Sequence, residues 1–391
     1  MDDRRGEEGF PVIYLDNAAS APALPCALQA VMPFISECCG NPSSIHTEGR
    51  RAALAIIEAR EKCAAAIGAK PEEIIFTSGG TESDNMALKS AAISGLSSGK
   101  KRIVITEIEH PAVLKSCEFL ERMGFEVKRL GVNSEGYVSP EQARELITPE
   151  TAVVSVMAAN NEIGTIQPVG EIAEICRSRG ALFHTDAVQA AGNIPLDVNA
   201  IGCDMMSVSA HKLGGIKGAG LLYCRSGCRI APLLHGGGQE NGMRSGTENT
   251  AAITAMGAAM EYSCRGIAER AKKISALRDR LISLLLEIPD SRLNGGLERR
   301  LCGNVNISFS GVEGESLVLG LDLRGVCASS GSACASGAVT SSHVLRAMGV
   351  PVEFQRGSLR LTLSEHNTAA EIEQAAAAVR ETVEMLRDIV G

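Results

Sequence analysis

Short apolar runs alternate with helical segments over residues 70–225 of this 391-residue chain, and this alternation restricts the fold more than any other feature. Seven runs have the length and the β-branched and aromatic content of strands: residues 73–77, 102–106, 125–130, 152–157, 181–184, 204–209 and 220–223. Helical segments lie between most of them, and one begins cleanly at Ser139 and Pro140. Repeated strand–helix units predict the α/β class, with a mostly parallel sheet covered by helices on both faces.

The rest of the chain predicts a second, smaller unit. A length of 391 residues exceeds what one core usually serves, and an apolar content of 45% is enough to fill two. After residue 250 we expect one long helix over 249–287, then further strands and helices, and a last helix that opens with a capping box at Thr368 and Glu371. We therefore predict a large domain of residues 15–260, and an α+β domain formed by residues 1–14 and 261–391.

Composition and charge exclude several classes of protein. A net charge of -8 with scattered basic residues argues against nucleic-acid binding. No apolar run approaches the ~18 residues that cross a bilayer, and the first eight residues lack the apolar core of a signal peptide. The thirteen cysteines are scattered and form no C-x-x-C, which argues against a disulfide framework and a preformed metal site. We expect a cytoplasmic protein.

Polar residues that follow the strands are the candidates for a site, because ligands of such sheets bind beyond the carboxyl ends of the strands. Gly80 and Thr81 form a turn that could offer N–H groups to a phosphate, or could simply connect strand and helix. His110 could stack on a ring and move protons, or lie on the surface. Asp186, with Gln189 three residues on, could pair with a protonated ring nitrogen or cap a helix.

Lys212 follows the strand at 204–209 and precedes four glycines between residues 214 and 220, where backbone could approach a ligand closely. A lysine at such a position is ordinarily a surface residue with its stem on apolar neighbours. If it is kept from water, its pKa falls and it can form a Schiff base, the bond that attaches pyridoxal phosphate to enzymes. The cluster of Ser209, His211 and Lys212 makes this reading the one to test.

Nine motifs, in order along the chain, closely resemble those of the cysteine desulfurases, which are pyridoxal phosphate enzymes of the class V aminotransferase superfamily. The resemblance runs from about residue 12 to residue 385, nearly the whole chain. The motifs are Tyr14-Leu-Asp-Asn-Ala-Ala19, Gly40-Asn-Pro-Ser-Ser44, Thr77-Ser-Gly-Gly-Thr-Glu-Ser83, Glu109-His-Pro-Ala-Val113, Asn160-Asn-Glu-Ile-Gly164, His184-Thr-Asp-Ala-Val-Gln189, Ser209-Ala-His-Lys212, Gly242-Met-Arg-Ser-Gly-Thr-Glu248 and Ser329-Ser-Gly-Ser-Ala-Cys334. The resemblance implies pyridoxal phosphate fold type I, with a seven-stranded sheet in the large domain.

The resemblance also implies a role for each matching residue. Lys212 would bind the cofactor, pyridoxal 5'-phosphate, as a Schiff base, and Asp186 would pair with the pyridine nitrogen. His110 would stack on the ring and act as an acid–base group, and Gln189 would hydrogen-bond the phenolic oxygen. Other cofactor contacts would come from Gly80, Thr81, Asn161, Ser209, His211 and, from the partner subunit of a homodimer, Thr247.

Arg360, in the predicted strand at 359–363, would bind the substrate carboxylate, assisted by Asn41. A planar guanidinium grips a carboxylate with two parallel hydrogen bonds, so the choice is chemically natural. The ordinary alternative for an arginine in a strand is a surface ion pair.

Cys334 lies within nine consecutive small residues, 329–337, whose composition is that of a flexible tether. We therefore expect an exposed and mobile thiol, unlike most of the other cysteines. The resemblance implies that L-cysteine takes the place of Lys212 on the cofactor, Lys212 removes the alpha proton, and Cys334 attacks the substrate sulfur. Alanine leaves, and the persulfide passes to an acceptor such as an iron–sulfur scaffold protein. Cys334 is also the one candidate ligand for a transient metal cluster.

The chain departs from the family pattern at Ser20, Ala210, Ile216 and the segment 340–343, none of which is a proposed catalytic residue. Two alternatives stay open at this point. One keeps the cofactor and changes the reaction, to a selenocysteine lyase or another class V aminotransferase-type enzyme. The other is a metal- or cluster-binding protein without enzyme activity, which the scattered cysteines disfavour.

Overall fold

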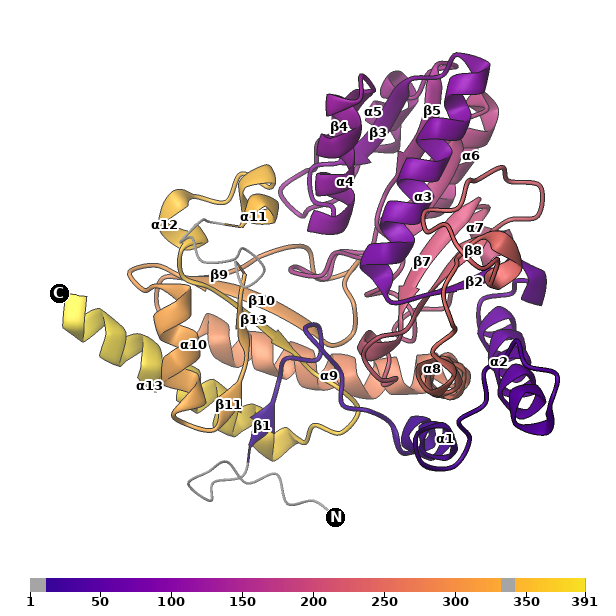
Figure 1. Cartoon of the computed structure of the whole chain (residues 1–391). Helices are drawn as coiled ribbons and strands as arrows, with labels where there is room; N and C mark the ends of the chain where they lie inside the picture. The colour runs from indigo at the N-terminus through magenta and orange to yellow at the C-terminus, as the bar shows by residue number, and fades with distance from the viewer. Residues whose placement is uncertain (1–11, 332–341, 391) are drawn as a thin grey trace.

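The computed structural model describes residues 12–331 and 342–390. Its largest sheet has seven strands in the order β2-β8-β7-β6-β5-β3-β4 (Figure 1). All neighbours are parallel except β8, which is antiparallel to both β2 and β7. In sheet order the strands are β2 (Ile74–Thr77), β8 (Gly220–Cys224), β7 (Met205–Ser209), β6 (Leu182–Asp186), β5 (Thr151–Ser155), β3 (Arg102–Thr106) and β4 (Glu126–Leu130). The predicted α/β fold with a mostly parallel seven-stranded sheet is confirmed.

Successive side chains of these strands enter two different cores, as the alternation of a strand requires. Ile75 and Ile103 pack in the core that contains α3 (Gly80–Gly95) and α4 (Pro111–Arg122). Phe76 and Val104 pack in the core on the other face. The helices that contribute to this second core are α1 (Pro25–Ser36), α2 (Thr47–Ala66), α5 (Pro140–Leu146), α6 (Val169–Arg179), α7 (Val198–Ile201) and α8 (Thr250–Ser263). Helices therefore cover both faces, and the carboxyl ends of the strands are held on a rigid layer.

A smaller sheet has its own apolar core. Four antiparallel strands lie in the order β12 (Ser329–Ser330), β13 (Ser358–Thr362), β10 (Asn304–Phe309) and β9 (Ser291–Leu293). Three helices contribute apolar side chains to this core: α9 (Ile267–Leu286), α10 (Gly314–Asp322) and α13 (Ala369–Val390). In the contacts between elements, α13 packs on α9 and α10. The short strands β1 (Ile13–Tyr14) and β11 (Val326–Cys327) pair beside this core, so the start of the described chain lies with its C-terminal part (Figure 1).

The capping box predicted for the last helix is confirmed. The Glu371 N–H donates to Thr368 Oγ1 at 3.2 Å, and the Thr368 N–H donates to Glu371 Oε2 at 2.8 Å. The single long helix predicted over 249–287 is wrong, because α8 ends at Ser263 and α9 begins at Ile267. Gly266 between them has φ +63°, a left-handed conformation that ends a right-handed helix.

Two short helices lie in the chain between β12 and β13: α11 (His343–Ala347) and α12 (Val352–Gln355). Val344 and Leu345 of α11 pack in a small apolar cluster with Ile108, Met157 and Ile163. Among residues 12–331 and 342–390, no helix combines the length and the apolar character that crossing a bilayer requires.

Candidate active site

The turn between β2 and α3 offers donors to an anion. The first backbone N–H groups of α3 have no carbonyl partner within the helix, and Thr81 lies in this first turn. A Cβ atom at Gly80 would lie 2.6 Å from Val188 Cγ2 and 3.6 Å from Ser209 Cβ, so glycine is needed for this close approach. His211 lies beyond β7, and burial with the nearby lysine charges lowers its pKa to about 4. The N–H groups at the start of α3, the Ser209 hydroxyl and the His211 imidazole together fit a phosphate.

Lys212 lies at the end of η3 (Ala210–Lys212), a single turn of 3-10 helix that directly follows β7. Its Nζ donates hydrogen bonds to the carbonyl oxygens of Ala18, at 2.5 Å, and Ala19, at 2.8 Å. Gly214 follows with φ +86°, and a Cβ atom there would lie 2.5 Å from Leu24 Cγ. The tight turn and the two carbonyls direct the amine to the cavity wall, instead of leaving it in solvent as for an ordinary surface lysine.

Asp186 ends β6 and is 4% exposed. Its Oδ1 accepts the N–H of Val188 at 2.9 Å. Burial raises the pKa of Asp186, while the nearby charges of His110 and Lys212 lower it. No helix begins in the described turn 187–197, so Asp186 does not cap one. A buried carboxylate with this surplus of acceptor capacity suits a cationic partner such as a protonated ring nitrogen.

His110 is the N-cap residue of α4, and its Nδ1 accepts the N–H of Ala112 at 3.1 Å. The neutral ring therefore carries its proton on Nε2. Burial is the largest cause that lowers its pKa, and Lys212 adds to the effect while Asp186 opposes it. The imidazole thus serves the fold as a cap and still presents a flat face and one nitrogen to the cavity.

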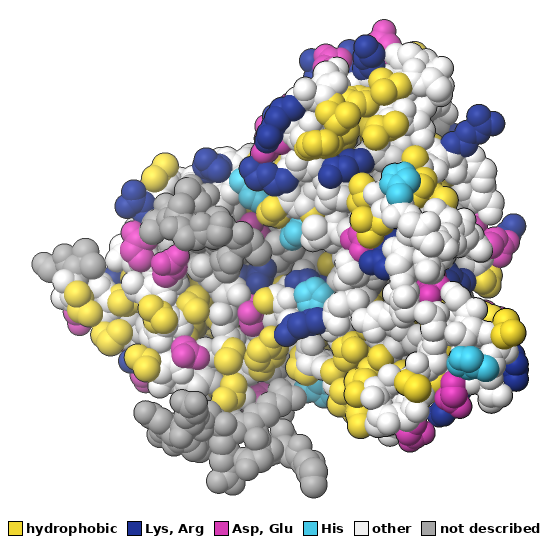
Figure 2. Space-filling model, in the orientation of Figure 1, with side chains coloured by type: hydrophobic (Ala, Val, Ile, Leu, Met, Phe, Trp, Pro, Cys, Tyr) yellow, Lys and Arg dark blue, Asp and Glu magenta, His cyan; other side chains and the backbone are white. Residues whose placement is uncertain are grey.

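Ten of the predicted site residues line one cavity at the carboxyl ends of the parallel strands. Figure 2 shows His, Lys and Arg side chains gathered in the hollow between the two halves of the molecule. The ten residues are Gly80, Thr81, His110, Asn161, Asp186, Gln189, Ser209, His211, Lys212 and Arg360. The Gln189 side-chain amide donates to the Ala18 carbonyl at 2.9 Å, so the segment that holds Lys212 also orients Gln189.

Two predicted residues of the described chain do not line this cavity. Thr247 and Asn41 are both exposed and do not line it, and Asn41 Oδ1 accepts the N–H of Ser43 at 2.9 Å. Cys334 lies outside the described residues. Across the described ranges, no group of three His, Cys, Asp or Glu side chains is arranged to hold a metal ion.

Two buried acids near the cavity were missed by the sequence analysis. Burial and the charge of Asp186 raise the pKa of Asp84 well above its usual range, and burial raises the pKa of Glu109 to about 8. Within the described chain, Asp84 Oδ1 and Glu109 Oε2 have no hydrogen-bond partner. An acid within a helix, such as Asp84, is ordinarily on the surface, so the sequence carries no signal for this position.

The cavity fits pyridoxal phosphate. A helix terminus with a glycine where a Cβ would clash suits the phosphate, a buried carboxylate suits the pyridine nitrogen, and a lysine reaches the same space. Sheet and site together define a class, the pyridoxal phosphate-dependent enzymes of fold type I. Comparison with known proteins agrees: the model of the family described as "Aminotransferase class-V" matches residues 13–375. The chain belongs to the aminotransferase class-V family, and within that family to the cysteine desulfurases.

Individual relatives support this placement. The chain is 48% identical over 378 residues to the "Cysteine desulfurase IscS" of Dictyoglomus turgidum, covering 96% of each chain. A solved structure titled "NIFS-LIKE PROTEIN" superposes with a TM-score of 0.90 at 38% identity, covering 96% of this chain and 100% of the other. A structure titled "SspA in complex with cysteine" gives a TM-score of 0.81 at 35% identity, with coverage of 91% and 100%.

Proposed function

We propose that this protein is a cysteine desulfurase that converts L-cysteine to L-alanine and collects the sulfur as a persulfide on Cys334. The observation that carries the proposal is the single cavity that unites Lys212, Asp186 and Arg360. Lys212 supplies an amine, Asp186 supplies a carboxylate for the ring nitrogen of the cofactor, and Arg360 supplies a guanidinium for the carboxylate of the substrate. The relatives named cysteine desulfurase, and the complex of SspA with cysteine, support the choice of substrate.

Each residue of the cavity would have its own role in the reaction. When bound, pyridoxal phosphate supplies an aldehyde for condensation with amines and a ring that withdraws electrons from the substrate. Asp186 would hold the ring nitrogen in its protonated form, and His110 would lie against the ring. Lys212 would move the proton from the substrate Cα, and the Ala18 and Ala19 carbonyls would orient the amine for this transfer. Arg360 would bind the substrate carboxylate.

Cys334 would take the sulfur. Its thiolate attacks the substrate sulfur, an S–S bond forms, and the carbon–sulfur bond breaks with its electron pair left on the carbon side. Protonation of that carbon yields alanine, and the terminal sulfur stays on Cys334. The persulfide then passes to an acceptor, either an iron–sulfur scaffold protein or another thiolation partner.

We also infer the oligomeric state, the cellular compartment and the domain division of the protein. A homodimer would let Thr247, which is exposed in this chain, reach the cavity of the partner. A reducing compartment such as the cytoplasm would keep the Cys334 thiol available. The separate apolar cores support a division into two domains. We propose residues 15–260 as the large domain and residues 1–14 and 261–391 as the small domain.

An assay of alanine and sulfide tests the proposal. The protein is saturated with pyridoxal phosphate and incubated with L-cysteine and a reductant, as wild type and as the Lys212→Ala and Cys334→Ala variants. We expect alanine from the wild type only, with at least a 100-fold loss in each variant. Cys39→Ala, which changes an exposed thiol, is the matched control and should keep full activity.

A selenocysteine lyase or another class V enzyme is the second candidate, since it would use the same cofactor site. Under that reading the Cys334→Ala variant keeps its turnover of cysteine or selenocysteine. Release of alanine by the Lys212→Ala variant at the wild-type rate would contradict both candidates.

A further inference from the structure

Arg360 is held by two of its three guanidinium nitrogens. The residue lies on β13 and is 6% exposed. Nη1 donates to the carbonyl oxygen of Asn161 at 3.0 Å, and Nη2 donates to Asp16 Oδ1 at 3.1 Å. The buried Nε has no hydrogen-bond partner within the described chain. A buried N–H without a partner costs about 1–3 kcal/mol, so this edge of the guanidinium is suited to an incoming acceptor.

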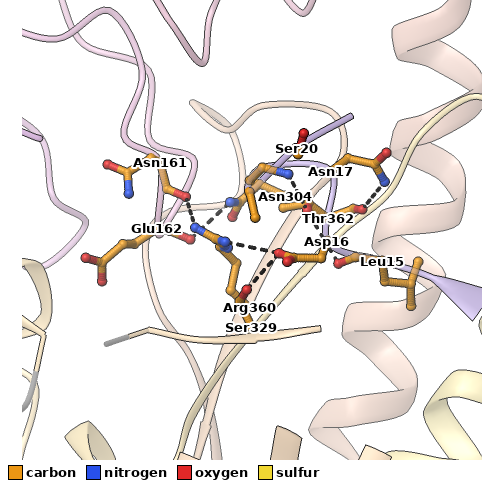
Figure 3. A network of polar contacts seen from close by, with 12 residues as sticks. Leu15, Asp16, Asn17, Ser20, Asn161, Glu162, Asn304, Ser329, Arg360 and Thr362 are labelled. Atoms are coloured by element: carbon orange, nitrogen blue, oxygen red, sulfur yellow. Dashed lines mark hydrogen bonds and ion pairs between the residues drawn. The ribbon is translucent and has the colours of Figure 1, made fainter. Parts of the chain in front are cut away.

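Asp16 binds more than the arginine. Its Oδ1 also accepts a hydrogen bond from Ser329 Oγ at 2.8 Å, and Ser329 lies opposite Arg360 in the pairing of β12 with β13 (Figure 3). One carboxylate oxygen therefore joins the arginine to the neighbouring strand. A flexible arginine gripped in this way loses much of its freedom before any ligand arrives, which reduces the entropy that binding must offset.

The segment that carries Asp16 is itself fixed to β13. The Thr362 N–H donates to the Leu15 carbonyl at 2.6 Å, and the Ala18 N–H donates to Thr362 Oγ1 at 2.8 Å. The Asn17 side-chain amide donates to the Thr362 carbonyl at 2.6 Å. The same segment supplies the carbonyls that hold Lys212. A single stretch of chain thus touches both the amine and the guanidinium of the cavity.

Of the two acids near Arg360, Asp16 is the one that forms an ion pair with it. Glu162 is the other nearby acid, but it is buried, its Oε2 accepts a hydrogen bond from Ser342, and burial raises its pKa to about 7. Asp16 is 19% exposed at its side chain and makes the only ion pair of Arg360 among the described residues. It therefore holds the guanidinium through Nη2, while the buried Nε keeps no acceptor within the described chain.

We propose that Asp16 is a positioning residue for the substrate carboxylate: it holds Arg360 so that the free Nε edge binds the carboxylate at a set distance from Lys212. This inference rests on the proposed function, because it assumes an amino-acid substrate. It deepens that function by naming the residue that makes the site selective for amino acids over simple amines.

The test compares two ligands on the cofactor-loaded enzyme. L-cysteine and cysteamine share an amine and a thiol, and only L-cysteine has a carboxylate. Binding of each is followed by the absorbance of the cofactor, and turnover of L-cysteine gives KM and kcat. For Asp16→Ala we expect a KM for L-cysteine at least 10-fold higher, kcat within 3-fold of wild type, and unchanged cysteamine affinity. Asp16→Asn keeps an oxygen acceptor and should restore KM to within 3-fold of wild type.

Glu313→Ala is the matched control, because it removes the acid of a surface pair with Arg356, 3.7 Å apart, and should change neither affinity. An unchanged KM in Asp16→Ala overturns the inference. So does an equal loss of cysteamine affinity, which would mean general damage to the cavity, and so does an Asp16→Asn variant as weak as Asp16→Ala. If wild type binds neither ligand, the proposed function itself has failed, and this outcome is distinct from the others.

Discussion

His184 lies behind the site, fully buried within β6. Its Nδ1 is 2.8 Å from Ser155 Oγ and its Nε2 is 2.9 Å from Ser207 Oγ, so both ring nitrogens have hydroxyl partners from the neighbouring strands. Burial lowers its pKa to about 3. The imidazole is therefore neutral throughout the physiological range, and it joins three strands through polar contacts in the interior of the sheet.

This buried histidine predicts a loss of stability in acid. Above pH 6.5 His184 is neutral in the folded and the unfolded chain, and it adds no pH dependence. Below pH 6.5 the unfolded chain takes up a proton on this histidine and the folded chain does not. The free energy of unfolding therefore falls with a slope that approaches about 1.4 kcal/mol per pH unit between pH 5.5 and pH 3. Urea unfolding at pH 7.5, 6.5 and 5.5 measures this slope.

The comparison variant is His184→Gln, which removes the titrating ring, with the exposed His366→Gln as control. The stability difference between wild type and His184→Gln should shrink by about 1 kcal/mol between pH 6.5 and pH 5.5, because the unfolded histidine is already half protonated at pH 6.5. Parallel stability curves over that range would show that His184 does not titrate in this way.

At single residues, the sequence was informative where a side chain follows a strand. Lys212, Asp186 and His110 could be predicted for one site, because the carboxyl ends of parallel strands meet at one edge of the sheet. The hydrogen-bond partners of Arg360 could not be predicted from the sequence. Asp16 reaches β13 across more than 300 residues of sequence, and only tertiary packing places the two together.

Gly220 starts β8 directly beside the turn that feeds α3. A Cβ atom at Gly220 would lie 2.6 Å from Gly79 Cα and 2.8 Å from the Val208 carbonyl oxygen, both of which are backbone atoms. Neither neighbour can move without displacing a strand or the start of α3. The close contact between these elements therefore depends on the missing side chain.

Gly220→Ala should destabilise the fold by about 1–3 kcal/mol, the usual range for overpacking. It should also weaken pyridoxal phosphate binding, because the displaced turn carries Gly80. Gly170→Ala, in α6, is the matched control: nothing lies within 4 Å of its Cβ position, and a small stabilisation is expected. Thermal unfolding and cofactor titration of both variants check this prediction. Equal behaviour of the two variants would contradict it.

At the level of elements, the seven strands of the large sheet could be predicted because most of them are apolar runs bounded by polar turns. The exception is β4, whose sequence Glu-Val-Lys-Arg-Leu is mostly charged. The break between α8 and α9 could not, because glycine is tolerated within many helices, and nothing local distinguishes Gly266 from such a residue. The helix α1 was also missed: it contains Pro33, which normally argues against a helix interior.

The whole molecule exposes an apolar stripe on its first helix. Leu28, Met32 and Ile35 lie at helical spacing on α1 and are 47%, 54% and 67% exposed. Leu54 and Ile57 on α2 are 59% and 50% exposed. Both helices pack against α8. Apolar side chains exposed on them indicate an interface, and a second copy of the chain is the partner that the proposed homodimer requires.

The double variant Met32→Asp with Ile35→Asp should convert the dimer to a monomer of half the mass in light scattering. Because Thr247 is proposed to act in the partner's cavity, the monomer should also bind pyridoxal phosphate at least 10-fold more weakly. Leu319→Asp with Leu323→Asp, on exposed apolar residues in α10 and at its C-cap, is the control and should stay dimeric. A double variant of α1 that keeps the dimer mass would exclude this face as the interface.

Lys212 is proposed to hold the cofactor as a Schiff base, and reduction with borohydride tests this assignment. The protein is loaded with pyridoxal phosphate, reduced, digested and mapped by mass spectrometry. We expect a phosphopyridoxyl group on the peptide that contains Lys212, and none in the Lys212→Ala variant. A reduced adduct on a different lysine, or a wild-type protein that forms no adduct, would contradict it.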